Sequence, residues 1–64
     1  MLIADRALLV LAHSGVKEAE YHLGLIYCTQ NNPEKALYWL KRSAFQGYQK
    51  AIDTIHEMLE KKLI

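Results

Sequence analysis

Cysteine, proline and glycine are scarce in this 64-residue chain, which contains one, one and three of them respectively. The single cysteine, Cys28, excludes a disulfide within the chain and favours a reducing compartment, so we expect a cytoplasmic protein. With so few helix breakers, long stretches of the chain are free to be helical. No segment alternates between apolar and polar residues as a half-buried strand does. These absences predict an all-α protein.

An excess of charge of either sign is also absent. Eight basic and seven acidic side chains are interspersed and leave a net charge of +1, so the chain lacks the basic patch that nucleic-acid binding needs. The apolar N-terminal stretch is interrupted by Asp5 and Arg6, and it is too short for a signal-peptide core or a membrane span. We therefore expect neither a nucleic acid nor a membrane as a partner. The apolar fraction of 52% is high for so small a chain and indicates surface for self-association or for a partner.

Turn signals divide the apolar pattern into helices. Gly15 and Gly47 are expected to cap helices in the left-handed conformation. Asn32 is expected to be an N-cap, with Pro33 at the first helical position, where its missing N–H costs nothing. The apolar spacing then predicts four helices, over about residues 2–13, 16–29, 33–46 and 48–62.

Small residues replace large ones on the facing sides of the two central helices. Gly24 lies in the middle of the second helix, where glycine costs about 1 kcal/mol relative to alanine, and this indicates a close approach by a neighbour. Small residues opposite large ones let two backbones come close and fix one register. The second helix carries on one face Ala19, Leu23, Gly24 and Tyr27. The third carries Ala36, Leu37, Leu40, Ser43 and Ala44, with Trp39 beside them.

The chain matches itself at a fixed spacing. Gly15 and Gly47 are 32 residues apart. A period in the thirties with helix–turn–helix content is typical of an α-solenoid. We therefore expect a single domain over residues 1–64, with one full repeat at about 16–47 between half repeats at 2–14 and 48–62. At the same spacing the matched pairs are Ala4 and Ala36, Leu8 and Leu40, Ala12 and Ala44, Ala19 and Ala51, Leu23 and Ile55, and Tyr27 and Leu59.

The repeat resembles the tetratricopeptide superfamily and, within it, the Sel-one-like (Sel1-like) repeat. The first helix of that repeat carries Leu-Gly-x-x-Tyr, which here is Leu23-Gly24-x-x-Tyr27. The second helix and the step into the next repeat are similar to Lys35-Ala36-x-x-Trp39-Leu40-x-x-Ser43-Ala44-x-x-Gly47-x-x-x-Ala51. The chain departs from the family pattern at Leu40, where the family has an aromatic residue, at Ser43, where it has alanine, and in the fourth helix at His56 and Leu59.

This resemblance implies four antiparallel helices, stacked as a short right-handed solenoid with a concave groove. It also implies that Trp39 packs between helices, and that the protein is a module that binds another protein or a peptide and has no catalytic activity. If the family geometry holds, Tyr21 points into the groove among apolar and charged neighbours, which is how interface cores are composed. The groove residues expected on this basis are Glu18, Tyr21, Leu25 and Cys28 in the second helix and Lys50, Asp53, Glu57 and Glu60 in the fourth.

No residue pattern predicts a cofactor, a metal or an enzyme. The three histidines, His13, His22 and His56, form no ligand spacing with Cys28 or with each other. Cys28 lies near a helix C-terminus, the wrong end to stabilise a thiolate, and no base is expected beside it.

Two further interpretations stay open. A small inhibitor or immunity-type protein, blocking one enzyme by shape, is a narrower form of the binding module. The alternative is a structural subunit, either a homodimer or a fragment that completes a longer solenoid. The homodimer is suggested by Leu2, Leu9 and Val10, which are left over when one face of the first helix is buried and which isologous pairing would remove from water.

Overall fold

The computed structural model describes residues 6–61, which form four helices and no strand. The all-α prediction is therefore confirmed for these residues. The first expected helix is described only from Arg6 onwards, so the part of it at residues 2–5, Leu2 included, lies outside the described residues. The helices are α1 (Arg6–His13), α2 (Lys17–Thr29), α3 (Pro33–Phe45) and α4 (Gln49–Glu60).

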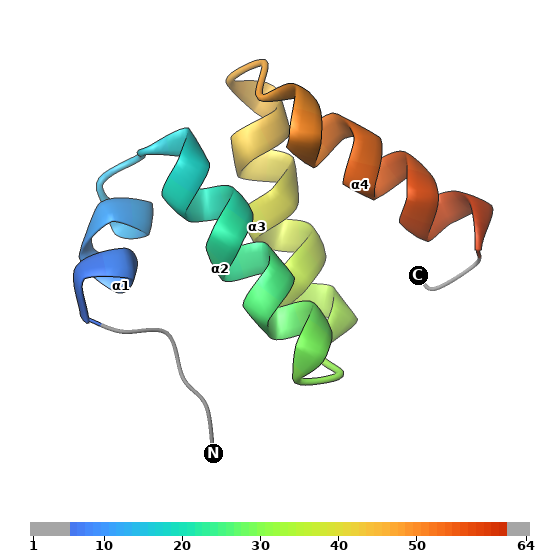
Figure 1. Ribbon diagram of the computed structural model, residues 1–64, viewed down its shortest axis with the longest axis horizontal. Helices are drawn as coiled ribbons and strands as arrows, with labels where there is room; N and C mark the ends of the chain where they lie inside the picture. Colours follow the sequence, from blue (N-terminus) through green and yellow to red (C-terminus); the bar gives the residue numbers. More distant parts are fainter. Residues whose placement is uncertain (1–5, 62–64) are drawn as a thin grey trace.

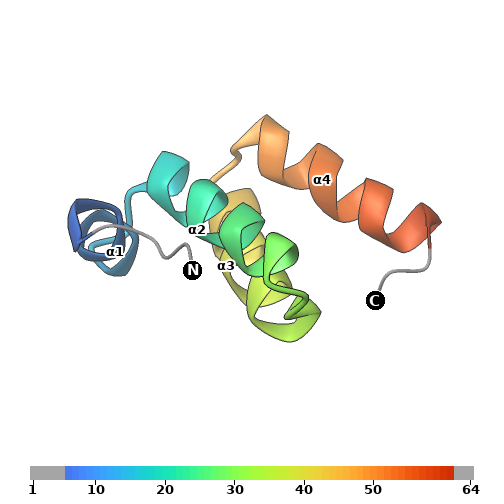
Figure 2. The same cartoon turned by 60° about the horizontal axis from the view of Figure 1, so that its bottom comes forward.

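The four helices lie in an open row (Figure 1). Each helix packs against the next one along the chain, and α2 and α3 form the most extensive contact. α1 and α4 lie on opposite sides of the α2–α3 pair, as the second view also shows (Figure 2). The Cα atoms extend over 32 × 29 × 14 Å. With the α2–α3 pair between them, the two end helices lie apart from each other (Figure 1).

The two glycine turns have the same geometry, 32 residues apart. Gly15 and Gly47 have φ angles of +93° and +83°, which confirms the expected left-handed caps. The next residues, Val16 and Tyr48, share a φ of −75°, with ψ of 115° and 108°. Their amides donate to the carbonyl five residues earlier, at 3.0 Å and 3.3 Å. The repeat seen in the sequence is therefore also a repeat of backbone geometry at these turns.

The turn between α2 and α3 is built differently, from asparagine. Asn31 adopts the left-handed conformation with φ of 60°, which asparagine tolerates better than most residues. The Asn32 side chain accepts a hydrogen bond from the Lys35 amide at 3.4 Å, and Pro33 begins the helix. Both parts of the expected N-cap are confirmed.

The buried apolar residues form two clusters joined by α3. Trp39 packs with Ala12, Ala19 and Leu23 on the side of α1 and α2. The next residue in the chain, Leu40, packs with Ala51 and Met58 on the side of α4. Because α3 contributes to both clusters, it connects the two halves of the row. The expectation that Trp39 packs between helices is confirmed.

Several large apolar side chains stay exposed at the ends of the row. Val10 and Leu11 of α1 are 62% and 47% exposed, and Leu59 of α4 is 57% exposed although it was expected on the buried face. The reason is that α1 and α4 each have a neighbour on one side only. Leu9 is half-buried and packs against the Trp39 cluster, so less of it is free than expected. No helix within residues 6–61 is long and apolar enough to cross a membrane.

Candidate functional site

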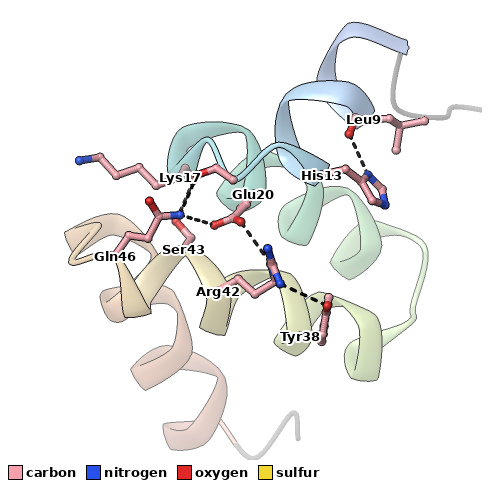
Figure 3. Close-up of polar contacts among 9 residues, drawn as sticks. Leu9, His13, Lys17, Glu20, Tyr38, Arg42, Ser43 and Gln46 are labelled. Carbon is pink, nitrogen blue, oxygen red and sulfur yellow. Dashed lines mark hydrogen bonds and ion pairs between the residues drawn. The ribbon is translucent and has the colours of Figure 1, made fainter.

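A buried carboxylate ties α2 to α3. Glu20 is 1% exposed, although the sequence suggested only a first-turn residue of α2 that complements the helix dipole. Its Oε2 accepts a hydrogen bond from Nε of Arg42 at 3.2 Å, and its Oε1 accepts one from Nε2 of Gln46 at 2.9 Å (Figure 3). A buried charge is tolerated when it is paired and hydrogen-bonded, as both oxygens are here. The hydrogen bonds to Glu20 and then to Tyr38 raise the pKa of Arg42 above its usual value.

Two side chains of α3 also bind backbone carbonyls near the start of α2. The Ser43 hydroxyl, fully buried, donates to the carbonyl of Lys17 at 2.8 Å. Gln46 Nε2 donates to the carbonyl of Gly15 at 2.9 Å. These bonds hold the glycine turn before α2 against the C-terminal end of α3. These hydrogen bonds therefore fix the register of α2 against α3. The polar groups that form them serve the helix contact.

The α2 and α3 backbones approach closely at Gly24, as the sequence predicted. A Cβ atom on Gly24 would lie 2.8 Å from Cγ of Leu40 and 3.2 Å from the carbonyl oxygen of Ala36. The first distance is shorter than van der Waals contact allows, so only glycine fits without a shift.

The α2 residues that were expected to line a groove differ in their solvent exposure and in their contacts with other helices. Tyr21 is half-buried, and its ring meets the Tyr48 ring edge-on with centroids 5.4 Å apart. It also packs against the cluster around Leu40, so much of this ring belongs to the contact between α2 and the start of α4. Leu25 is half-buried, and Glu18 is exposed.

A small cavity lies where the end of α2 comes near the end of α4. It measures about 160 Å³ and is lined by Cys28, Asn31, Pro33 and Met58. Cys28 is one of the expected groove residues, and burial raises the pKa of its thiol, so the neutral form persists to higher pH than in a free thiol. Of the expected groove, this is the part that the structure forms as a hollow.

The four groove residues expected on α4 are all exposed. They are Lys50, Asp53, Glu57 and Glu60. Asp53 accepts a hydrogen bond from the Gln49 side chain at 2.8 Å within the helix. The set places one basic and three acidic groups along a single helix, so this edge is mainly acidic.

A second hollow of about 470 Å³ opens beside the buried carboxylate. It is more open than the first, and its lining includes Lys41, Phe45 and the polar residues Arg42 and Gln46. Phe45 is 93% exposed, the most exposed large apolar side chain among residues 6–61. Sequence reasoning did not single out Phe45, because this residue lies outside the apolar face expected for the third helix.

Metal-binding side chains do not converge in the described part of the chain. No three residues of the types His, Cys, Asp or Glu come together at metal-binding distance within residues 6–61. His13 instead meets the Trp39 ring edge-on at 5.0 Å, and its Nδ1 donates to the carbonyl of Leu9 at 2.8 Å. This histidine thus helps to join α1 to α3.

Sequence reasoning missed three residues that line the small cavity, Asn31, Pro33 and Met58. Pro33 was expected at the first position of the third helix, where it lies, but no role in a site was expected for it. What the sequence did not reveal is that the turn after α2 and the end of α4 line one hollow. The buried Glu20 was a detectable signal, since it shares a helical face with Leu23 and Gly24.

Comparisons with known proteins give no relative. No protein-family model matches the chain, and no curated protein or solved structure is significantly similar to it. What the site does must therefore be inferred from its own contacts and from the repeat.

Proposed function

We propose that this protein is a protein–protein interaction module of the Sel1-like helical-repeat type, with the groove between α2 and α4 as its binding site. The observation that carries the proposal is the cavity lined by Cys28, Asn31, Pro33 and Met58. It lies on the side of the row where Leu25 and Tyr21 are half-buried. An apolar floor that is partly open to solvent is what the core of a protein interface requires.

The size of the cavity favours a side chain of another protein over a free small molecule. Its volume of about 160 Å³ is well below the roughly 300–1,000 Å³ of small-molecule and cofactor sites. It has room for one apolar side chain of a bound segment. We infer that the partner inserts an apolar anchor here, in the way that interface hot spots fill pockets.

The exposed charges of α4 suggest the polarity of the partner. Asp53, Glu57 and Glu60 are exposed on α4, with Lys50 as the only opposing charge in the set. A segment with basic residues flanking its apolar anchor fits this edge, and such rim charges mainly speed association and select partners. The same surface, the cavity with the acidic face of α4, would bind the partner whether it is a scaffold component or an enzyme that the protein blocks.

The repeat supports the assignment to the Sel1-like class. The two glycine turns share their backbone angles at a spacing of 32 residues, and Gly24 provides the close approach that Leu-Gly-x-x-Tyr serves in that class. Helical repeats of this kind stack into extended concave binding surfaces.

The single cysteine allows a direct test of the groove. A bulky maleimide attached to Cys28 fills the cavity, and we expect the labelled chain to lose a partner that the unlabelled chain captures from native lysate. The matched control is Cys28→Ser combined with Lys41→Cys, which carries the same adduct at the second hollow and should retain the partner. The raised pKa of Cys28 slows labelling, so the reaction is run for longer at neutral pH, where the maleimide stays selective for the thiol over the lysine side chains.

The two labelled chains separate the outcomes. Loss of capture with the Cys28 adduct and retention with the Lys41→Cys adduct support the proposal, provided that circular dichroism shows equal helicity. Equal capture by both labelled chains would place the binding site elsewhere. The acidic edge is tested with Glu57→Lys, for which we expect weaker capture and a smaller dependence on salt.

A further inference from the structure

Exposed apolar side chains are concentrated at the two ends of the helix row. At one end, Val10 and Leu11 of α1 are exposed. At the other end, Leu59 of α4 is exposed, with Ile52 half-buried on the same side of the helix. Phe45, at the end of α3, is almost fully exposed. Val16, the N-cap of α2, and Tyr38 of α3 are also exposed, so it is the pairing of the two ends and not exposure alone that points to an interaction site.

The 32-residue register relates one end to a contact already present inside the chain. Because the two glycine turns have the same geometry, α1 corresponds to α3. Val10 and Leu11 then occupy the positions of Arg42 and Ser43. Arg42 and Ser43 are two of the α3 residues that contact α2, through Glu20 and through a backbone carbonyl. The exposed face of α1 therefore corresponds to the face of α3 that contacts α2.

The same register applies to the other end, where α4 corresponds to α2. Ile52 takes the position of Glu20, and Leu59 takes the position of Tyr27. Glu20 faces α3 through its ion pair, and Tyr27 lies on the same side of α2, where Lys35 Nζ of α3 is 5.6 Å from its ring centroid. The exposed face of α4 therefore corresponds to the face of α2 that contacts α3.

The two ends are thus the two halves of one interface, and we propose that copies of this chain join head to tail. In this arrangement, α1 of a second copy docks on α4 of the first, in the position that α3 occupies on α2. The proposal depends on the repeat arrangement of the proposed function but not on its groove. Ile52 and the second copy's Val10 replace the ion pair of Glu20 and Arg42, so the new contact buries apolar surface without burying a charge.

Side-chain sizes across the new contact are complementary. Inside the chain, His13 of α1 meets the large ring of Trp39 on α3 at 5.0 Å. In the same register, Phe45 takes the place of His13, and the second copy's Ala7 takes the place of Trp39. A large ring then faces a small side chain, and docking covers Phe45, which the rest of residues 6–61 leaves 93% exposed.

One difference makes the new contact looser than the internal one. His56 stands at the position of Gly24, where even a Cβ atom would lie 2.8 Å from Leu40 of the neighbouring helix. The docked helix must therefore sit further from α4 than α3 sits from α2. Leu11 in place of Ser43 fills part of the wider space. We expect weak, reversible association that continues beyond two copies, because a head-to-tail contact does not close on itself.

Complementation between two variants tests the proposal. Val10→Glu damages the α1 end and Leu59→Glu damages the α4 end, so each variant alone should be monomeric by analytical ultracentrifugation. An equal mixture should form dimers that do not grow, because each variant keeps one intact end. The unsubstituted chain should increase steadily in average mass between about 1 μM and about 1 mM, the range of small interfaces. The matched control, His22→Glu, adds a negative charge at an exposed position of α2 and should assemble as the unsubstituted chain does.

The outcomes differ for each way of pairing. A dimer that is lost in one variant, persists in the other and is not restored by mixing would show isologous pairing and overturn the proposal. A monomer at every concentration would also overturn it. Should Leu59→Glu prove unfolded by circular dichroism, Phe45→Ser serves instead at the same end, because that ring has almost no contacts to lose, and we expect at least about tenfold weaker association.

The register is tested by moving the internal ion pair to the ends. Val10→Arg and Ile52→Glu each should weaken assembly, and the double variant should regain it, because the two charges then meet between copies as Arg42 and Glu20 meet within one. No gain in the double variant would contradict the proposed register. A maleimide on Cys28 should leave assembly unchanged, so a failure of the groove proposal and a failure of this one can be told apart.

Discussion

The contact between α2 and α3 and the outer face of α4 follow from the same turn geometry but present opposite surfaces. In α2, Gly24 and Glu20 admit a close neighbour and bind it with an ion pair. At the corresponding positions α4 carries His56 and Ile52, and no helix of the described residues covers that side. The comparison teaches that the repeated turn sets the direction of a helix, whereas one or two residues on its face decide how closely another helix can pack.

The largest expected effect comes from filling the closest approach. Gly24→Val places a branched side chain against Leu40 and against the fixed carbonyl of Ala36, and we expect a loss of about 3 kcal/mol in the free energy of unfolding. For a chain of this size that is a large part of the total stability. Urea unfolding followed by circular dichroism measures it.

The matched substitution on α4 sharpens the contrast. His56→Val introduces the same side chain at the corresponding, exposed position, and the change should stay within about 0.5 kcal/mol. Similar losses for the two variants would mean that α2 and α4 do not differ in the way described. Both are measured at low protein concentration, so that association between chains does not contribute.

An intermediate effect is expected from removing the buried carboxylate. Glu20→Ala takes away the acceptor of Arg42 and Gln46 and leaves space at a buried position, so we expect a loss of about 1–3 kcal/mol. Glu18→Ala, two residues earlier and exposed, is the control and should change stability by less than about 0.5 kcal/mol. A stability of Glu20→Ala equal to that of the control would show that the ion pair contributes nothing net.

The smallest effects test whether the two turns are equivalent. Gly15→Ala and Gly47→Ala each force a Cβ atom into the left-handed region, at a cost of about 1–2 kcal/mol, with no steric contact nearby in either case. We expect the two losses to agree within about 0.5 kcal/mol by thermal or urea unfolding. Clearly different losses of unfolding free energy would mean that the two turns share backbone angles but contribute differently to stability.

Local signals made much of the fold predictable. Gly15, Gly47 and the Asn32–Pro33 pair act within a few residues of their own positions, so the helix limits follow from the sequence to within a few residues. Gly24 was informative because a glycine inside a helix needs a neighbour to explain it. The burial of Glu20 was signalled by the face it shares with Leu23 and Gly24, but its partner was not, because Arg42 is 22 residues away and the pairing depends on how α2 and α3 cross.

The candidate site was only partly accessible to sequence reasoning. The groove residues on α2 and α4 were inferred from a family geometry, and the structure forms a hollow only around Cys28. Whether a position such as Tyr21 faces solvent or the next helix is set by how α2, α3 and α4 pack together, as its contact with the Tyr48 ring shows. That packing results from the sum of many side-chain contacts and leaves no single mark in the sequence.

The thinness of the molecule, 14 Å along its shortest axis, has a consequence for its dynamics. Most stabilising contacts join segments adjacent in the sequence, which favours rapid folding and lets the terminal helices fray without opening the centre. Amide hydrogens of α2 and α3 should then exchange with solvent most slowly and those of α1 fastest. In a row of helices of this shape, the outer helices unfold locally before the central pair does, whereas a globular core opens as one unit.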